Sequence, residues 1–92
     1  VIEERVTIQS FCNIREDVHL KKGAMIATKA IIGKQTTVGE KVFIGMHSIL
    51  EAGIQVGDHA VVSMGSYVRS DVEAGMIVGG NPARTVGRKQ SI

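Results

Sequence analysis

The chain has 92 residues, enough for one small domain, and 43% of them are hydrophobic although only 3% are aromatic. Eleven Lys and Arg residues against nine Asp and Glu leave a net charge of +2, which is too balanced for a nucleic-acid-binding protein. The single cysteine excludes an internal disulfide framework and a cysteine-rich zinc site. No apolar run is long enough to span a bilayer and no secretory signal pattern opens the chain, so we expect a cytoplasmic protein without membrane contact.

An aliphatic residue recurs at every sixth position along most of the chain. These residues are, in chain order, Ile2, Ile8, Ile14, Leu20, Ile26, Ile32, Val38, Ile44, Leu50, Val56, Val62 and Val68. A second, mostly small set follows each of them by four positions, from Val6 to Val72. A period of six fits neither a helix nor a long strand, but it suits short strands joined by tight corners. Three such units make one triangular turn, so we predict an all-β, single-stranded parallel β-helix of about four coils.

The period ends after Val72 in this interpretation, and residues 73–84 are predicted to form a turn followed by an exit segment. We therefore expect a β-helix over residues 1–73 and a C-terminal turn and tail over residues 74–92.

Residues 18 apart stack in adjacent coils, and this spacing defines three outer faces. Two of the faces are apolar, and the third is polar. The first carries Thr7, Met25, Phe43 and Val61, the second Asn13, Ile31, Ile49 and Tyr67, and the third His19, Thr37 and Gln55. Two apolar faces on a triangular prism are what a cyclic trimer needs. We expect a homotrimer that packs through the Met25/Phe43/Val61 and Ile31/Ile49/Tyr67 faces.

Histidine is the natural candidate for proton transfer near neutral pH, and His47 is the foremost of three. It occupies a corner, with Lys29 one coil before it and Gly65 one coil after it. The neighbouring column contains Met46 and Met64, an apolar strip suited to the pantetheine arm of a thioester cofactor.

The other two histidines have weaker claims. His59 occupies the equivalent corner of another edge, and His19 lies on the polar face. A histidine on an exposed corner is often simply solvated, and this alternative stays open for all three. Cys12 falls on a small inward position, where a thiol behaves as a small hydrophobe rather than as a reactive group.

The repeat resembles the hexapeptide motif of left-handed parallel β-helix proteins, most of which are acyltransferases. Within that superfamily, residues 39–45, 56–58 and 79–84 are similar to the last coils of sugar O- and N-acetyltransferases. The left hand comes from this resemblance alone, because the general rule for parallel crossovers predicts the right hand.

The resemblance implies an acetyl-CoA-dependent acyltransferase that moves an acetyl group to a hydroxyl or amine of a sugar or similar small acceptor. The resemblance makes acetyl-CoA a co-substrate bound between neighbouring prisms. Its binding residues would be Met46, Met64, Arg69 and Arg84, and an arginine guanidinium pairs well with phosphate oxygens. Our candidate for the general base is His47, which is chosen from its corner position and not from the resemblance, because a histidine at this place in galactoside-type members is not their base. No metal is expected.

Two alternatives stay open. In the resembling enzymes the base comes from a loop or an earlier coil, whereas here Ile14 to Gly33 runs through in period with no inserted loop. A non-catalytic trimerising scaffold, or the tail domain of a longer enzyme such as a sugar nucleotidyltransferase, would fit that feature. A γ-carbonic-anhydrase-like protein is the less favoured alternative. Two of that family's zinc-ligand positions fall at Lys29 and Lys34, and lysine is not a usual zinc ligand.

Overall fold

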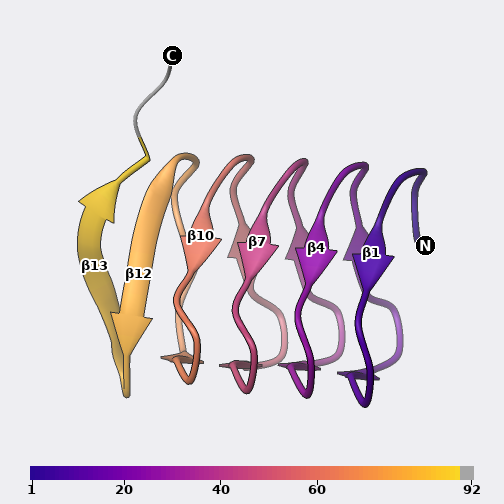
Figure 1. Ribbon diagram of the computed structural model, residues 1–92, viewed down its shortest axis with the longest axis horizontal. Helices are drawn as coiled ribbons and strands as arrows, with labels where there is room; N and C mark the ends of the chain where they lie inside the picture. The colour runs from indigo at the N-terminus through magenta and orange to yellow at the C-terminus, as the bar shows by residue number, and fades with distance from the viewer. Residues whose placement is uncertain (90–92) are drawn as a thin grey trace.

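The structure, a computed structural model, describes residues 1–89 as a β-solenoid of stacked coils (Figure 1). The strands are β1 (Thr7–Ile8), β2 (Asn13–Ile14), β3 (His19–Leu20), β4 (Met25–Ile26), β5 (Ile31–Ile32), β6 (Thr37–Val38), β7 (Phe43–Ile44), β8 (Ile49–Leu50), β9 (Gln55–Val56), β10 (Val61–Val62), β11 (Tyr67–Val68), β12 (Met76–Gly80) and β13 (Ala83–Arg88). No helix long and apolar enough to cross a membrane occurs in this part of the chain.

The strands form three sheets, one on each side of a triangular prism. Face I has the strand order β1-β4-β7-β10-β12-β13, face II the order β11-β8-β5-β2, and face III the order β3-β6-β9. Apart from the last pairing, between β12 and β13, all of these pairs are parallel. Residues 18 apart stand side by side, as Met25 and Phe43 do, except between β10 and β12, where Val61 pairs with Ile77. The predicted columns and the four-coil, all-β solenoid are therefore confirmed.

The inward aliphatic residues form one continuous core. Leu20, Ile26, Ile32 and Ile44 have no exposed surface, although Ile8 in the first coil is 39% exposed. Alternating with them are small inward residues, some of them polar, and these are hydrogen-bonded to carbonyl oxygens. The hydroxyls of Thr36, Ser48 and Ser66 donate to main-chain oxygens at 3.1, 3.0 and 2.6 Å. Cys12 packs against the same core and is half-buried.

The corners of the prism are fixed by the main chain. His47 has a φ of 61°, a conformation that most non-glycine residues avoid. Its N–H donates to the carbonyl of Thr28 one coil earlier at 3.0 Å, and Gly65 donates in the same way to Met46 at 2.8 Å. The predicted corner positions of His47 and His59 are confirmed, since both have positive φ and make this bond.

The last coil is two residues shorter than the others. Val56 pairs with Val72 and Val62 with Val78, so these partners are 16 residues apart instead of 18. Val72 therefore takes a large inward position, and the sequence-based assignment of Val72 to the small set was wrong. The six-residue spacing then resumes from Val72 to Val78, beyond the point where the repeat was expected to end.

The segment after residue 73 contributes two strands, which the expected turn and tail did not include. β12 joins face I next to β10, and β13 returns antiparallel to β12 at the end of the solenoid (Figure 1). Residues 90–92 of the expected tail lie outside the described residues.

Removing core volume tests the stacking directly. Ile44→Ala is expected to lower the free energy of unfolding by about 2–5 kcal/mol, because the fully buried side chain leaves a cavity. Val86→Ala, at a residue that is 67% exposed, should change it by less than about 0.5 kcal/mol. Urea unfolding followed by far-UV circular dichroism measures both, and equal losses in the two variants would contradict the assigned core.

Candidate functional site

The corner between faces I and II brings three of the predicted site residues together. His47 lies in the turn between β7 and β8, directly after Met46, and Met64 and Gly65 stack on these two residues in the next coil. The four residues line an open hollow of about 380 Å³, called here the corner hollow. The positions predicted for the base and for the thioester cofactor are thus adjacent in space.

A second hollow of about 280 Å³ opens on face I beside the first, and is called here the face-I hollow. It is lined by Gln9, Ala27, Phe43, Gly45, Met46 and Met64. Because both hollows include Met46 and Met64, the two thioether side chains form a ridge between them. Gly45 is required at this place, since a Cβ there would lie 2.5 Å from the backbone nitrogen of Met64.

The two predicted arginines lie in different places. Arg84 is in β13 opposite Gly79, which packs against Ser63 next to Met64. Arg84 is therefore about two strand spacings, roughly 10 Å, from the coil of Met64 on the same side of face I. Arg69 directly follows β11, at the carboxyl-end edge of face II, whereas His47 precedes the neighbouring strand β8 at the opposite edge of the same face. A single chain brings Met46, Met64 and His47 together, places Arg84 nearby and leaves Arg69 apart.

The histidine with a carboxylate partner is His19 on face III, and not His47. Its Nε2 atom is 2.6 Å from a carboxylate oxygen of Glu3, whose other oxygen accepts the backbone N–H of Lys22 at 3.1 Å. The hydrogen bond from His19 lowers the pKa of the Glu3 carboxyl below its ordinary value. On face II, the Tyr67 hydroxyl donates to Glu51, and this bond raises the pKa of Tyr67.

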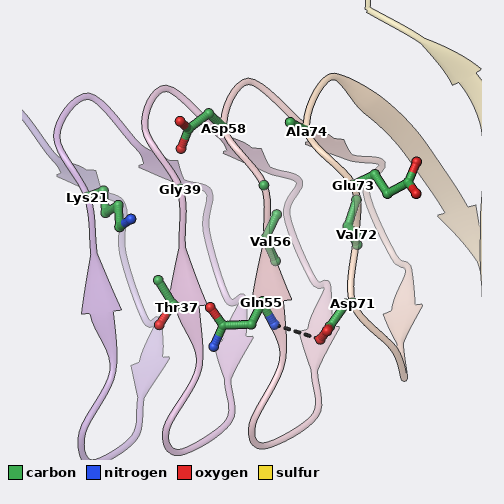
Figure 2. Close-up of a pocket in the computed structure, with 11 residues that line it drawn as sticks. Lys21, Thr37, Gly39, Gln55, Val56, Asp58, Asp71, Val72, Glu73 and Ala74 are labelled. Carbon is green, nitrogen blue, oxygen red and sulfur yellow. Dashed lines mark hydrogen bonds between the residues drawn. The ribbon is translucent and has the colours of Figure 1, made fainter.

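Face III carries a broad polar hollow of about 450 Å³ that the sequence reasoning missed (Figure 2). Lys21 borders one side of it, Thr37 and Gln55 line one end, and Asp58 and Asp71 lie at the rim. Asp71 accepts the backbone N–H of Gln55 at 2.9 Å and Asp58 accepts a backbone N–H at 2.8 Å, so both carboxylates already hold main-chain donors.

The sequence signal for this polar hollow is the pair Gly39 and Gly57, which are 18 residues apart and stack in one outward column. Because neither residue has a side chain, the surface of face III is lower there than beside it. Neither residue was interpreted in this way from the sequence. Within residues 1–89, no three His, Cys, Asp or Glu side chains are grouped as metal ligands would be.

Comparison with known proteins agrees with the fold. A family model described as the hexapeptide repeat of succinyl-transferase matches residues 35–70. No curated protein matches the sequence significantly. The solved UDP-N-acetylglucosamine acyltransferase from Campylobacter jejuni is 19% identical with a TM-score of 0.91, over 92% of this chain and 34% of that chain.

Two acetyltransferase structures align over nearly the whole chain. A maltose O-acetyltransferase from Clostridium difficile 630 is 19% identical with a TM-score of 0.75, over 99% of this chain and 65% of that one. A galactoside acetyltransferase in complex with coenzyme A is 20% identical with a TM-score of 0.67, over 97% and 55% of the two chains.

These comparisons confirm the resemblance to the hexapeptide-repeat superfamily and the left-handed parallel β-helix. At these identities the likeness to solved structures shows the fold and not the reaction. The chain spans only about a third of the length of two of the solved structures that it matches.

The Glu3–His19 pair predicts a pH dependence of stability. Because folding lowers the pKa of Glu3, its contribution is complete above the ordinary glutamate value and is lost as pH falls through the folded-state value. The urea midpoint of the native chain should therefore exceed that of Glu3→Gln near pH 6, and the difference should shrink below about pH 4. Glu73→Gln, an exposed carboxyl on the same face, is the matched control. A difference between native and Glu3→Gln that stays constant from pH 6 to pH 3 would contradict the assignment.

Proposed function

We propose that this chain, a left-handed β-helix whose residues 35–70 match a hexapeptide-repeat family model, is an acyltransferase that uses acetyl-CoA or a related acyl-CoA. The acceptor is a hydroxyl or amine of a sugar or similar small molecule. The observation that carries the proposal is the corner between faces I and II, where His47 borders an apolar hollow walled by Met46 and Met64. Several proteins of this fold are acetyltransferases, and the galactoside enzyme was solved with coenzyme A.

In the proposed reaction, the neutral imidazole of His47 takes the proton of the acceptor hydroxyl or amine. The acceptor oxygen or nitrogen then attacks the carbonyl carbon of the thioester, and a tetrahedral intermediate forms. Its collapse breaks the carbon–sulfur bond, and the departing thiolate recovers the proton from the imidazolium. The products are an ester or amide and free coenzyme A, so the step needs no oxidant or reductant.

The cofactor would use both the apolar ridge and the arginines. Met46 and Met64 are soft, flexible side chains that pack well against the thin pantetheine arm. Arg84 is exposed on the same side of face I, where its guanidinium is free to pair with a cofactor phosphate. In a cyclic trimer, face I of one prism is turned towards face II of the next, so Arg69 of the partner subunit would approach the same groove.

The trimer itself is part of the proposal. Faces I and II both expose large apolar side chains in one chain: Phe43 and Ile49 are each 40% exposed and Ile31 is 37% exposed. Contiguous apolar columns of this kind mark interaction surfaces more often than scattered hydrophobic residues do. Face III, with His19, Thr37 and Gln55 along its strands, would remain in solvent.

One observation favours the alternative of a non-catalytic trimerising scaffold. Among the side-chain hydrogen bonds of residues 1–89, the histidine ring with a partner is that of His19, with Glu3, and not that of His47, whereas catalytic bases are usually oriented by a partner group. A scaffold would ignore acetyl-CoA, which makes the two functions separable by binding alone.

Isothermal titration of acetyl-CoA into the purified chain, after its mass in solution is measured, tests the cofactor site. We expect about one site per protomer, and Arg84→Ala should weaken binding about tenfold because a charge-assisted pair with phosphate is lost. Arg15→Ala is the matched control, because Arg15 directly follows β2 in the first coil, at the opposite end of the solenoid from Arg84. No detectable binding at millimolar cofactor would overturn the enzyme proposal in favour of the scaffold.

His47→Ala tests the base. It should lower acetyl transfer to an accepting sugar about 10²–10⁴-fold, the usual contribution of a positioned base, while acetyl-CoA still binds. His59→Ala, the equivalent corner residue on another edge, should leave the rate unchanged. The assay follows free thiol release during a screen of sugar and amino-sugar acceptors. Equal rates of acetyl transfer in the His47→Ala and His59→Ala variants would show that His47 is not the base.

A further inference from the structure

The walls of the face-I hollow are formed mostly by apolar side chains that are exposed in the single chain. Phe43 and Met46, two of its walls, are each 40% exposed, and Met64 is 70% exposed. Apolar concavities bordered by large hydrophobic side chains are the usual form of a small-molecule subsite. The hollow adjoins the corner hollow along the Met46–Met64 ridge, so a ligand held beside His47 can extend into it.

The floor of the face-I hollow stays low because its residues are small. Gly45 cannot carry a side chain, as the 2.5 Å approach of the Met64 nitrogen shows, and Ala27 one coil earlier is only 6% exposed. A larger residue at position 27 would fill the space between Gln9 and Phe43. The depth of the hollow is therefore set by Ala27 and Gly45 together.

The same hollow offers few hydrogen-bond partners. Gln9 is the one polar side chain among its lining residues, and its carbonyl oxygen already accepts the N–H and the hydroxyl of Thr28 at 3.1 and 3.2 Å. The side-chain NH2 of Gln9 is then the one side-chain donor that remains in the lining, so the two amides of pantetheine or a carboxylate buried there would lose more hydrogen bonds to water than they gain, which costs free energy. The hollow therefore fits a hydrocarbon chain better than it fits the two amides of pantetheine or the terminal carboxylate of a succinyl group.

We propose that the face-I hollow is an acyl-chain subsite and that the preferred donor carries a short hydrocarbon acyl group longer than acetyl. This inference rests on the proposed function. The pantetheine arm lies on the corner-hollow side of Met46 and Met64, with the thioester beside His47, and the acyl chain passes across the Met46–Met64 ridge onto Ala27 and Gly45. An acetyl group ends before the ridge and makes no contact with the apolar walls of the face-I hollow.

Titration of acetyl-CoA, butyryl-CoA and succinyl-CoA into the native chain tests the subsite. Butyryl-CoA has two more methylene groups than acetyl-CoA, and burying both should tighten binding about tenfold. Succinyl-CoA has the same chain length with a terminal carboxylate and should bind no more tightly than acetyl-CoA. Equal affinities for acetyl-CoA and butyryl-CoA would overturn the subsite while leaving the proposed function in place. Failure of all three to bind would overturn the proposed function itself.

Ala27→Leu locates the effect. It should reduce the butyryl-to-acetyl affinity ratio from about ten to about one, because the leucine side chain occupies the hollow. Ala52→Leu makes the same change at an exposed corner that lines neither hollow, and it should keep the native ratio. If Ala27→Leu does not fold by circular dichroism, Ala27→Val adds less volume and should still lower the ratio. If a folded variant at position 27 kept the native butyryl-to-acetyl affinity ratio, the acyl chain would bind elsewhere, and the assignment of the face-I hollow as its subsite would be wrong.

Discussion

Everything in this protein depends on the stacking of one coil on the next. In the middle coils each inward aliphatic side chain lies between those 18 residues before and after it, and the corner residues of the second and later coils donate their N–H groups to carbonyls one coil earlier. The first interaction removes apolar surface from water, and the second satisfies main-chain groups that a tight corner would otherwise leave unpaired. Together they keep the coils in register at six residues per side, except at the shortened corner between Val68 and Val72.

This constraint separates structural from functional positions. The inward residues are committed to the core, whereas the outward residues and the corners are free to vary. His47 occupies a corner with φ of 61° because the corner bond from its N–H holds that conformation, and its ring takes no part in it. The ridge of Met46 and Met64 arises similarly: stacking places equivalent positions of adjacent coils side by side, so two residues 18 apart make one surface.

Sequence periodicity was enough to predict the columns on all three faces, because strict spacing leaves one register. It failed at the last coil. The four-residue step from Val68 to Val72 looks like the usual large-to-small spacing within one unit, and only the pairing of Val72 with Val56 shows that a corner has been shortened. The hollow on face III was missed for a related reason, since the glycines that create it matter through what their neighbours in other coils leave open.

The sequence by itself determined the class of fold, the four coils, the corner position of His47 and the adjacency of Met46 and Met64, because all of these follow from a fixed period. The tertiary structure alone decided the pairing of β12 and β13 on face I, the separation of Arg69 from Arg84, and the partition of the apolar strip into two hollows. Those features depend on where backbones approach closely and how side chains fill the space between coils. A repeat specifies which residues are neighbours, but not the volume they leave between them.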